Sequence, residues 1–86
     1  MTKWSLLLTH RAEKDLRELS SEDSDRVMLG LARLAIEGAG DIRRLKHVDP
    51  PEWRLRVGDV RVRLTYRPDE KEIIALRILP RGKAYR

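Results

Sequence analysis

Arginine alternates with apolar residues in two neighbouring segments of the C-terminal half of the chain. The first segment contains Arg54 and Arg56, and the second contains Arg61 and Arg63. Because successive side chains of a strand point to opposite faces of a sheet, each segment places its two arginines on one face. Gly58-Asp59 separates the two segments and predicts a β-hairpin with a two-residue turn.

In a hairpin with this turn, Arg54 lies opposite Arg63 and Arg56 lies opposite Arg61, with no acidic residue interleaved. Like charges that face each other destabilise a sheet, so a purely structural surface is expected to alternate its signs. The alternative is a solvated face on which the arginine stems cover the sheet and the guanidinium groups stay in water. Guanidinium groups also fit phosphate oxygens in a forked geometry. We therefore expect an anionic ligand to supply the missing negative charge.

The last predicted strand, residues 72–79, contains a further arginine. Arg77 joins the basic face if Ile74, Leu76 and Ile78 are the buried set of this strand. A shift of one residue in register, or a β-bulge, would redistribute the pairs.

The tail that follows the last strand carries two more cations and a phenol. Arg81 and Lys83 extend the basic surface, and Tyr85 lies close to both of them in the sequence. A tyrosine beside a basic sheet can stack on a nucleic-acid base or move a proton. The alternative is that Tyr85 only packs against the protein or frays with the end of the chain.

Positive charge is concentrated in one half of the chain. Residues 1–52 hold 9 Lys and Arg and 10 Asp and Glu, whereas residues 53–86 hold 10 Lys and Arg and 4 Asp and Glu. The positive charge that gives the chain its net charge of +5 therefore lies in the C-terminal half. Since this half is built from predicted strands rather than an amphipathic helix, its polyanionic partner is expected to be nucleic acid before a membrane surface.

Several classes of protein do not fit the composition. The chain has no cysteine, and His10 and His47 belong to no spaced ligand motif, so no disulfide framework, metal site or cofactor is predicted. The apolar run near the N-terminus is too short for a membrane span or a leader. At 86 residues the chain is expected to be one domain, residues 1–86, of a cytoplasmic protein.

The N-terminal half predicts a strand followed by two helices. The short apolar run within 3–8 is typical of a strand. Thr9 is placed to cap a first helix at about 10–19, and Ser20 to cap a second at about 22–37.

The second helix carries more apolar surface than one buried face requires. One stripe contains Val27, Leu31 and Leu34, and the other contains Leu29 and Ile36. The first interpretation is a helix that packs on both the sheet and the first helix, and the alternative is a docking surface for a partner chain.

Residues 41–52 are expected to form a connector, because Pro50-Pro51 is incompatible with a helix or a central strand. The predicted order is β-α-α-β-β-β. It gives an α+β fold in which a small, twisted, mostly antiparallel sheet packs against an N-terminal helical hairpin.

This order, the string Arg54-Leu55-Arg56-Val57-Gly58-Asp59 followed by Arg61, and the close Arg81-Gly82-Lys83-Ala84-Tyr85 resemble the RelE/ParE superfamily of toxins from type II toxin–antitoxin systems. The resemblance covers essentially the whole chain. For RelE-like members it implies a metal-free endoribonuclease that cuts messenger RNA in the ribosomal decoding site. Cleavage proceeds by attack of the RNA 2′-OH on the adjacent phosphate and leaves a cyclic phosphate and a 5′-hydroxyl.

The resemblance also implies roles for individual residues. Arg61 and Arg81 would stabilise charge that develops on the phosphate, and Tyr85 would stack on the base or assist proton transfer. The residues expected to hold the RNA backbone are Arg54, Arg56, Arg63 and Lys83.

Two positions depart from the pattern of the family. Pro80 stands where many members have a histidine, and the first strand of the hairpin carries arginine where a family lysine can transfer a proton. Arginine does not readily release its proton, so activity would rest on Tyr85 and on electrostatics.

The resemblance leaves two other functions open, and it implies a partner. The chain would be either a ParE-like poison of DNA gyrase or a non-catalytic RNA-binding domain if it does not cut RNA. As a toxin, it would be held by a cognate antitoxin with an acidic or amphipathic segment that covers the basic sheet and the spare apolar stripe of the second helix.

Overall fold

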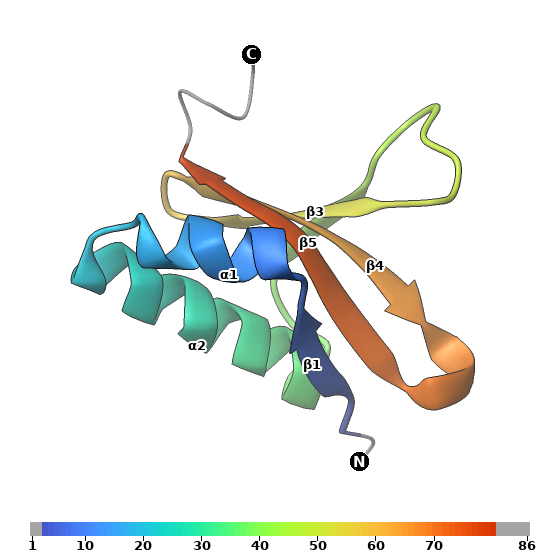
Figure 1. Ribbon diagram of the computed structural model, residues 1–86. Helices are drawn as coiled ribbons and strands as arrows, with labels where there is room; N and C mark the ends of the chain where they lie inside the picture. The colour runs from blue at the N-terminus through green and yellow to red at the C-terminus, as the bar shows by residue number, and fades with distance from the viewer. Residues whose placement is uncertain (1–2, 81–86) are drawn as a thin grey trace.

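A five-stranded mixed sheet with both helices on one side makes up the fold (Figure 1). The computed structural model describes residues 3–80. The elements are β1 (Ser5–Leu8), α1 (His10–Arg17), α2 (Ser21–Glu37), β2 (Asp41–Arg44), β3 (Trp53–Val57), β4 (Val60–Arg67), a short 3-10 helix η1 (Pro68–Glu70) and β5 (Glu72–Pro80). The strand order is β1-β5-β4-β3-β2, with β1 parallel to β5 and every other neighbouring pair antiparallel. The predicted α+β class is confirmed.

Strand β2 lies inside the region that was expected to be a connector, so that prediction was wrong for residues 41–44. The strand pairs with β3, with Asp41 opposite Arg56 and Ile42 opposite Leu55. Ile42 is its single apolar residue, so it has no alternating apolar pattern to reveal it. The order is therefore β-α-α-β-β-β-β.

The capping residues of both helices act as predicted. The Thr9 hydroxyl accepts a hydrogen bond from the Ala12 N–H, and the Ser20 hydroxyl accepts one from the Asp23 N–H. Gly38 ends α2 in the left-handed conformation, with φ of 70°. The first helix ends at Arg17 and is thus slightly shorter than expected.

The core lies between the helices and one face of the sheet. Its fully buried large side chains are Val27, Leu31, Leu55, Val62, Leu64, Ile73 and Ile78. Helix α2 approaches β3 closely at Gly30, where an added Cβ would lie 2.8 Å from a methyl carbon of Val57. A glycine at this position therefore sets the spacing of the two layers.

Helix α2 buries one of its two apolar stripes. Val27, Leu31 and Leu34 are buried, whereas Leu29 is 66% exposed and Ile36 is 42% exposed. The interpretation that both stripes pack inside the protein was therefore wrong, and the second stripe is an exposed surface.

No helix within residues 3–80 is long and apolar enough to span a membrane.

Candidate nucleic-acid interface

The hairpin of β3 and β4 has the predicted register. Arg54 pairs with Arg63 and Arg56 pairs with Arg61, because the two-residue turn Gly58-Asp59 joins Val57 directly to Val60. The apolar residues between these arginines point into the core, so the arginines point to the opposite face of the sheet, away from the helices. We call this surface the arginine face.

A β-bulge brings Arg77 of β5 onto the arginine face. Arg63 pairs with Arg77 and Leu64 pairs with Ala75, so Leu76 is an extra residue in β5. Arg77 therefore joins the face as predicted, but because of the bulge and not because Ile74, Leu76 and Ile78 are all buried.

The predicted buried set of β5 was wrong at two of its three positions. Ile78 is buried, whereas Ile74 and Leu76 are only partly buried and Ile73 and Ala75 take their places in the core. The change from a spacing of two residues to a spacing of three marks the bulge.

Strand β2 contributes an arginine that was not among the predicted site residues. Arg43 pairs with Arg54 across β2 and β3, so one row of the arginine face reads Arg43, Arg54, Arg63 and Arg77 across four strands. Arg43 was missed because its strand was missed. The signal available in the sequence was an arginine beside a single apolar residue, which is too short a pattern to define a strand.

Three acidic residues from outside the hairpin accompany this row, although none is interleaved between the arginines of the hairpin itself. Asp41 Oδ1 lies 3.5 Å from Arg54 Nη2, and Glu52 Oε1 lies 2.6 Å from Arg63 Nη2. Asp15 of α1 pairs with Arg77, with 2.8 Å between Oδ2 and Nε. These carboxylates come from three different parts of the chain, which is why the local alternation of β3 and β4 did not reveal them.

Asp15 is the most deeply buried of the three, with 7% of its side chain exposed. It accepts two hydrogen bonds from the Arg77 guanidinium and one of 3.0 Å from the backbone N–H of Ile78. Burial alone would raise the pKa of Asp15. The bonds from Arg77 and Ile78, together with the positive charge of Arg77, outweigh burial and hold the pKa below its ordinary value.

Arg61 is buried, with 6% exposed, whereas its partner Arg56 is exposed. The Arg61 Nη1 donates to the carbonyl oxygen of Gly58 in the hairpin turn at 3.4 Å. Strand β5 passes beside it, with Leu79 opposite Arg61 and Pro80 opposite Val60. The arrangement fixes one guanidinium group beside the C-terminal end of β5.

The three predicted site residues of the tail, Arg81, Lys83 and Tyr85, lie outside the described residues. They follow Pro80, which is the last residue of β5 and pairs beside Arg61. The structure therefore brings together the predicted arginines of the hairpin and leaves the predicted residues of the tail as expectations.

An aromatic cluster occupies the other end of the sheet. The ring of Tyr66 meets Trp4 and Trp53 edge to face, with centroid distances of 5.8 and 4.8 Å, and Arg44 lies 5.8 Å above the Trp53 ring. Burial raises the pKa of the Tyr66 hydroxyl.

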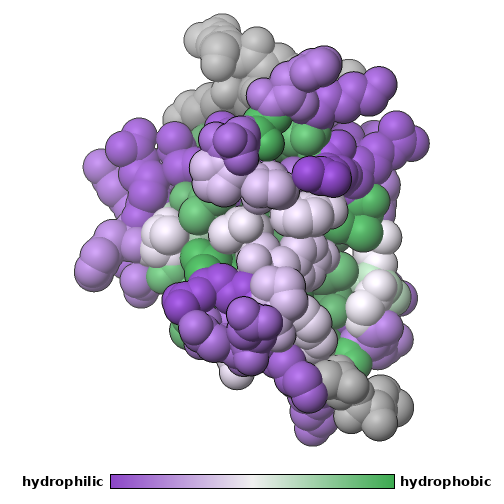
Figure 2. Space-filling view, turned by 90° about the vertical axis from the view of Figure 1, so that its right-hand side faces the viewer, coloured by the Kyte–Doolittle hydropathy of each residue, from purple (hydrophilic) through white to green (hydrophobic). Residues whose placement is uncertain are grey.

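On the side of the molecule that Figure 2 shows, hydrophilic residues surround a band of intermediate and hydrophobic ones.

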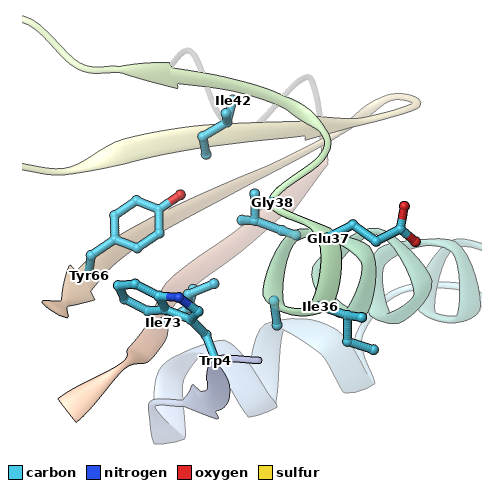
Figure 3. Close-up of a pocket in the computed structure, with 9 residues that line it drawn as sticks. Trp4, Ile36, Glu37, Gly38, Ile42, Tyr66 and Ile73 are labelled. Atoms are coloured by element: carbon cyan, nitrogen blue, oxygen red, sulfur yellow. The ribbon is translucent and has the colours of Figure 1, made fainter. Parts of the chain in front are cut away.

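Beside this cluster is a hollow of about 370 Å³ between Trp4, which precedes β1, the strands β2, β4 and β5, and the end of α2 (Figure 3). Trp4, Tyr66, Ile42 and Ile36 line it, with the Tyr66 side chain directed toward Ile42 and Gly38. Its lining is mostly apolar and holds one charged side chain, Glu37. It therefore has none of the convergent cations that distinguish the arginine face.

Within residues 3–80, no group of three or more histidine, cysteine or acidic side chains is arranged to hold a metal ion. The described part of the arginine face offers guanidinium groups, which bind and stabilise anions.

The structure is similar to solved structures of RelE proteins. A chain of the archaeal RelE–RelB complex from Pyrococcus horikoshii matches with a TM-score of 0.77 and 25% sequence identity, over 96% of this chain and 99% of that chain. A chain of the toxin–antitoxin complex RelBE2 from Mycobacterium tuberculosis matches with a TM-score of 0.79, 19% identity and 95% coverage of both chains. A mutant of the E. coli toxin RelE in the free state matches with a TM-score of 0.70 and 16% identity, over 98% and 90%. No protein-family model and no curated protein sequence matches the chain.

Proposed function

Because the chain has the fold of the RelE-like superfamily, we propose that it is the toxin of a type II toxin–antitoxin system and cuts messenger RNA in the ribosomal decoding site. The observation that carries this proposal is the arginine face, where Arg54 and Arg56 of one strand pair in register with Arg63 and Arg61 of the next. Such a concentration of guanidinium groups is suited to a chain of phosphates.

We propose that Arg54, Arg56 and Arg63 bind the RNA backbone. Arg56 and Arg63 are exposed, and Arg56 can donate two parallel hydrogen bonds to a phosphate, whereas Arg63 can do so with the donors that Glu52 does not occupy. Arg54 lies between Arg43 and Arg63 in the row and adds charge at its centre. Lys83 of the tail would also bind the RNA backbone.

The proposed reaction is a transesterification within the RNA. The 2′-OH loses its proton and attacks the neighbouring phosphorus, and the bond to the 5′-oxygen of the next nucleotide breaks. The leaving 5′-oxygen takes up a proton, so the products are a 2′,3′-cyclic phosphate and a 5′-hydroxyl. The nucleophile belongs to the RNA, so the path needs no metal-bound water.

Arg61 and Arg81 are assigned to the negative charge that develops on the phosphate. The side chain of Arg61 is held by the turn carbonyl of Gly58, so its guanidinium group is already oriented before the RNA binds. A donor that is fixed in advance stabilises a transition state without reorganisation at the moment of reaction. Tyr85 would stack on the base or transfer a proton, since arginine is a poor proton donor.

The proposed partner is an antitoxin that covers the same surface. An acidic segment would neutralise the arginine face, and an amphipathic helix would cover Leu29 and Ile36 of α2, which are exposed. Two of the similar solved structures are complexes of toxin with antitoxin or of RelE with RelB.

The test is induced expression in cells of the wild type and of the variants Arg61→Ala and Tyr85→Ala, with growth and messenger-RNA integrity as readouts. Arg33→Ala on the exposed side of α2 is the matched control, because it removes the same charge outside the arginine face. We expect growth arrest with cut transcripts in the wild type and the control, and intact transcripts in both site variants. Arrest with intact RNA would instead indicate gyrase poisoning, and absence of arrest would indicate an inactive toxin or a plain binding domain.

A further inference from the structure

Glu52 forms an ion pair with the guanidinium group of Arg63 in the middle of the arginine face. Its Oε1 lies 2.6 Å from Nη2 and accepts a hydrogen bond of 2.9 Å from Nε of the same side chain. One carboxylate oxygen thus takes the Nε–Nη2 pair, which is one of the two forked donor pairs that the guanidinium group can offer to a phosphate.

The backbone around Glu52 holds this carboxylate in place. The Glu52 carbonyl oxygen accepts a hydrogen bond from the Leu45 N–H at 2.9 Å. The carbonyl of the preceding residue, Pro51, accepts one of 3.1 Å from the Thr65 hydroxyl on β4. The side chain of Glu52 is 17% exposed, whereas that of Arg63 is 45% exposed. The contact is therefore built into the loop before β3, and its cationic partner still reaches solvent.

Asp41 makes a looser contact of the same kind. Its carboxylate is 51% exposed and lies 3.5 Å from the guanidinium group of Arg54. By contrast, Arg43 and Arg56 form no ion pair with any other described residue. The face therefore contains two open cations, Arg43 and Arg56, next to three cations that already carry a carboxylate.

We propose that Glu52, assisted by Asp41, regulates the RNA-binding face as an internal competitor for the phosphate groups. This inference rests on the proposed function, because it concerns the surface assigned to RNA. A phosphate reaches the Nε–Nη2 donors of Arg63 only by displacing Glu52, so part of the free energy of binding at these donors is lost in breaking this pair. The RNA phosphates therefore bind Arg56 and Arg43 directly, whereas at Arg63 a phosphate replaces the Glu52 carboxylate.

The experiment measures binding of a labelled single-stranded RNA of about ten nucleotides to the purified full-length protein by fluorescence anisotropy over a range of salt concentrations. Glu52→Gln keeps the shape of the side chain and removes its charge. We expect this variant to bind RNA about two- to fivefold more tightly at low salt, which corresponds to a partly exposed ion pair. The slope of log affinity against log salt should steepen by about 0.7, equivalent to one more phosphate contact.

Two controls separate local competition from a general change of charge. Asp25→Asn on the exposed side of α2 removes one negative charge away from the arginine face and should change affinity less than Glu52→Gln does. In an Arg63→Ala background the gain from Glu52→Gln should disappear, because the displaced pair no longer exists. Asp41→Asn, at a more exposed position, should give a smaller gain of at most about twofold.

The outcomes distinguish this inference from the proposed function. RNA binding by the wild type with no gain in Glu52→Gln, or with an equal gain in Asp25→Asn, would overturn the competitor role and leave the RNA-binding face intact. Absence of RNA binding in the wild type and in all variants would overturn both. Thermal unfolding of each variant, followed by circular dichroism, confirms that the compared proteins are folded.

Discussion

The pairs Asp15–Arg77 and Glu52–Arg63 each join a carboxylate to a guanidinium group. Their arginines lie opposite each other on the adjacent strands β4 and β5. They differ in their surroundings. Asp15 is buried and also accepts the backbone N–H of Ile78, whereas Glu52 binds a guanidinium group that is nearly half exposed. The first pair therefore holds the helix, the bulge and the strand together, and the second mainly sets how much positive charge the surface presents.

Removal of the buried carboxylate should have the largest effect on stability. We expect Asp15→Ala to lower the free energy of unfolding by about 3 kcal/mol, because it leaves the Ile78 N–H without an acceptor and Arg77 without its anion. Urea unfolding followed by circular dichroism measures this loss. Glu13→Ala, at an exposed position of the same helix, is the control, and an equal loss in both variants would contradict the structural role of Asp15.

The pH dependence of stability should show the same contrast. The pKa of Asp15 is lower in the folded protein than its ordinary value of 3.8, so its contribution is fully present above that value and is lost as the pH falls through the folded pKa. Asp15→Asn removes this contribution. The difference in unfolding free energy between wild type and Asp15→Asn should therefore shrink toward acid pH. A difference that stays constant in acid would show that the charge of Asp15 is not involved.

The exposed pair should contribute far less to stability. Glu52→Gln is expected to lower the free energy of unfolding by about 0.5 kcal/mol, and this loss should fade as salt is added. The measurement is a urea titration at low and at high salt. A loss as large as that of Asp15→Ala would remove the distinction between the two pairs.

The exposed stripe of α2 should contribute least of all. Leu29→Ser is expected to change the free energy of unfolding by no more than about 0.5 kcal/mol, because the Leu29 side chain is 66% exposed. Its buried neighbour Leu31 supplies the comparison, since Leu31→Ala should lower the free energy of unfolding by about 3 kcal/mol. If an antitoxin helix covers the stripe, Leu29→Ser should still weaken its binding by about tenfold. Titration of the co-expressed antitoxin measures this, and unchanged affinity would place the antitoxin elsewhere.

Those parts of the fold that depend on short-range patterns could be predicted from the sequence. The two-residue turn Gly58-Asp59 determines the register of the hairpin, so the opposition of Arg54 to Arg63 and of Arg56 to Arg61 followed directly. Helix starts were equally local, because a side-chain hydroxyl caps a backbone N–H three residues ahead.

Features that depend on contacts between distant residues could not be predicted in this way. The bulge at Leu76 is stabilised by α1, through the Thr9 hydroxyl that donates to the Leu76 carbonyl and through Asp15, which lies 63 residues from Ile78. The pairing of Glu52 with Arg63 depends on how the loop before β3 folds back. A sequence pattern contains the residue types of these contacts but not their partners.

The parallel pairing of β1 with β5 has a consequence for how the protein is made. Ser5 lies opposite Glu72, and the Thr9 hydroxyl binds the carbonyl of a residue 67 positions later. During synthesis the first strand therefore has no partner until β5 has been translated, and contacts of such long sequence separation form slowly. The arginine face is completed last, since Arg77 belongs to that final strand. A nascent chain therefore lacks a complete arginine face until β5 has been translated.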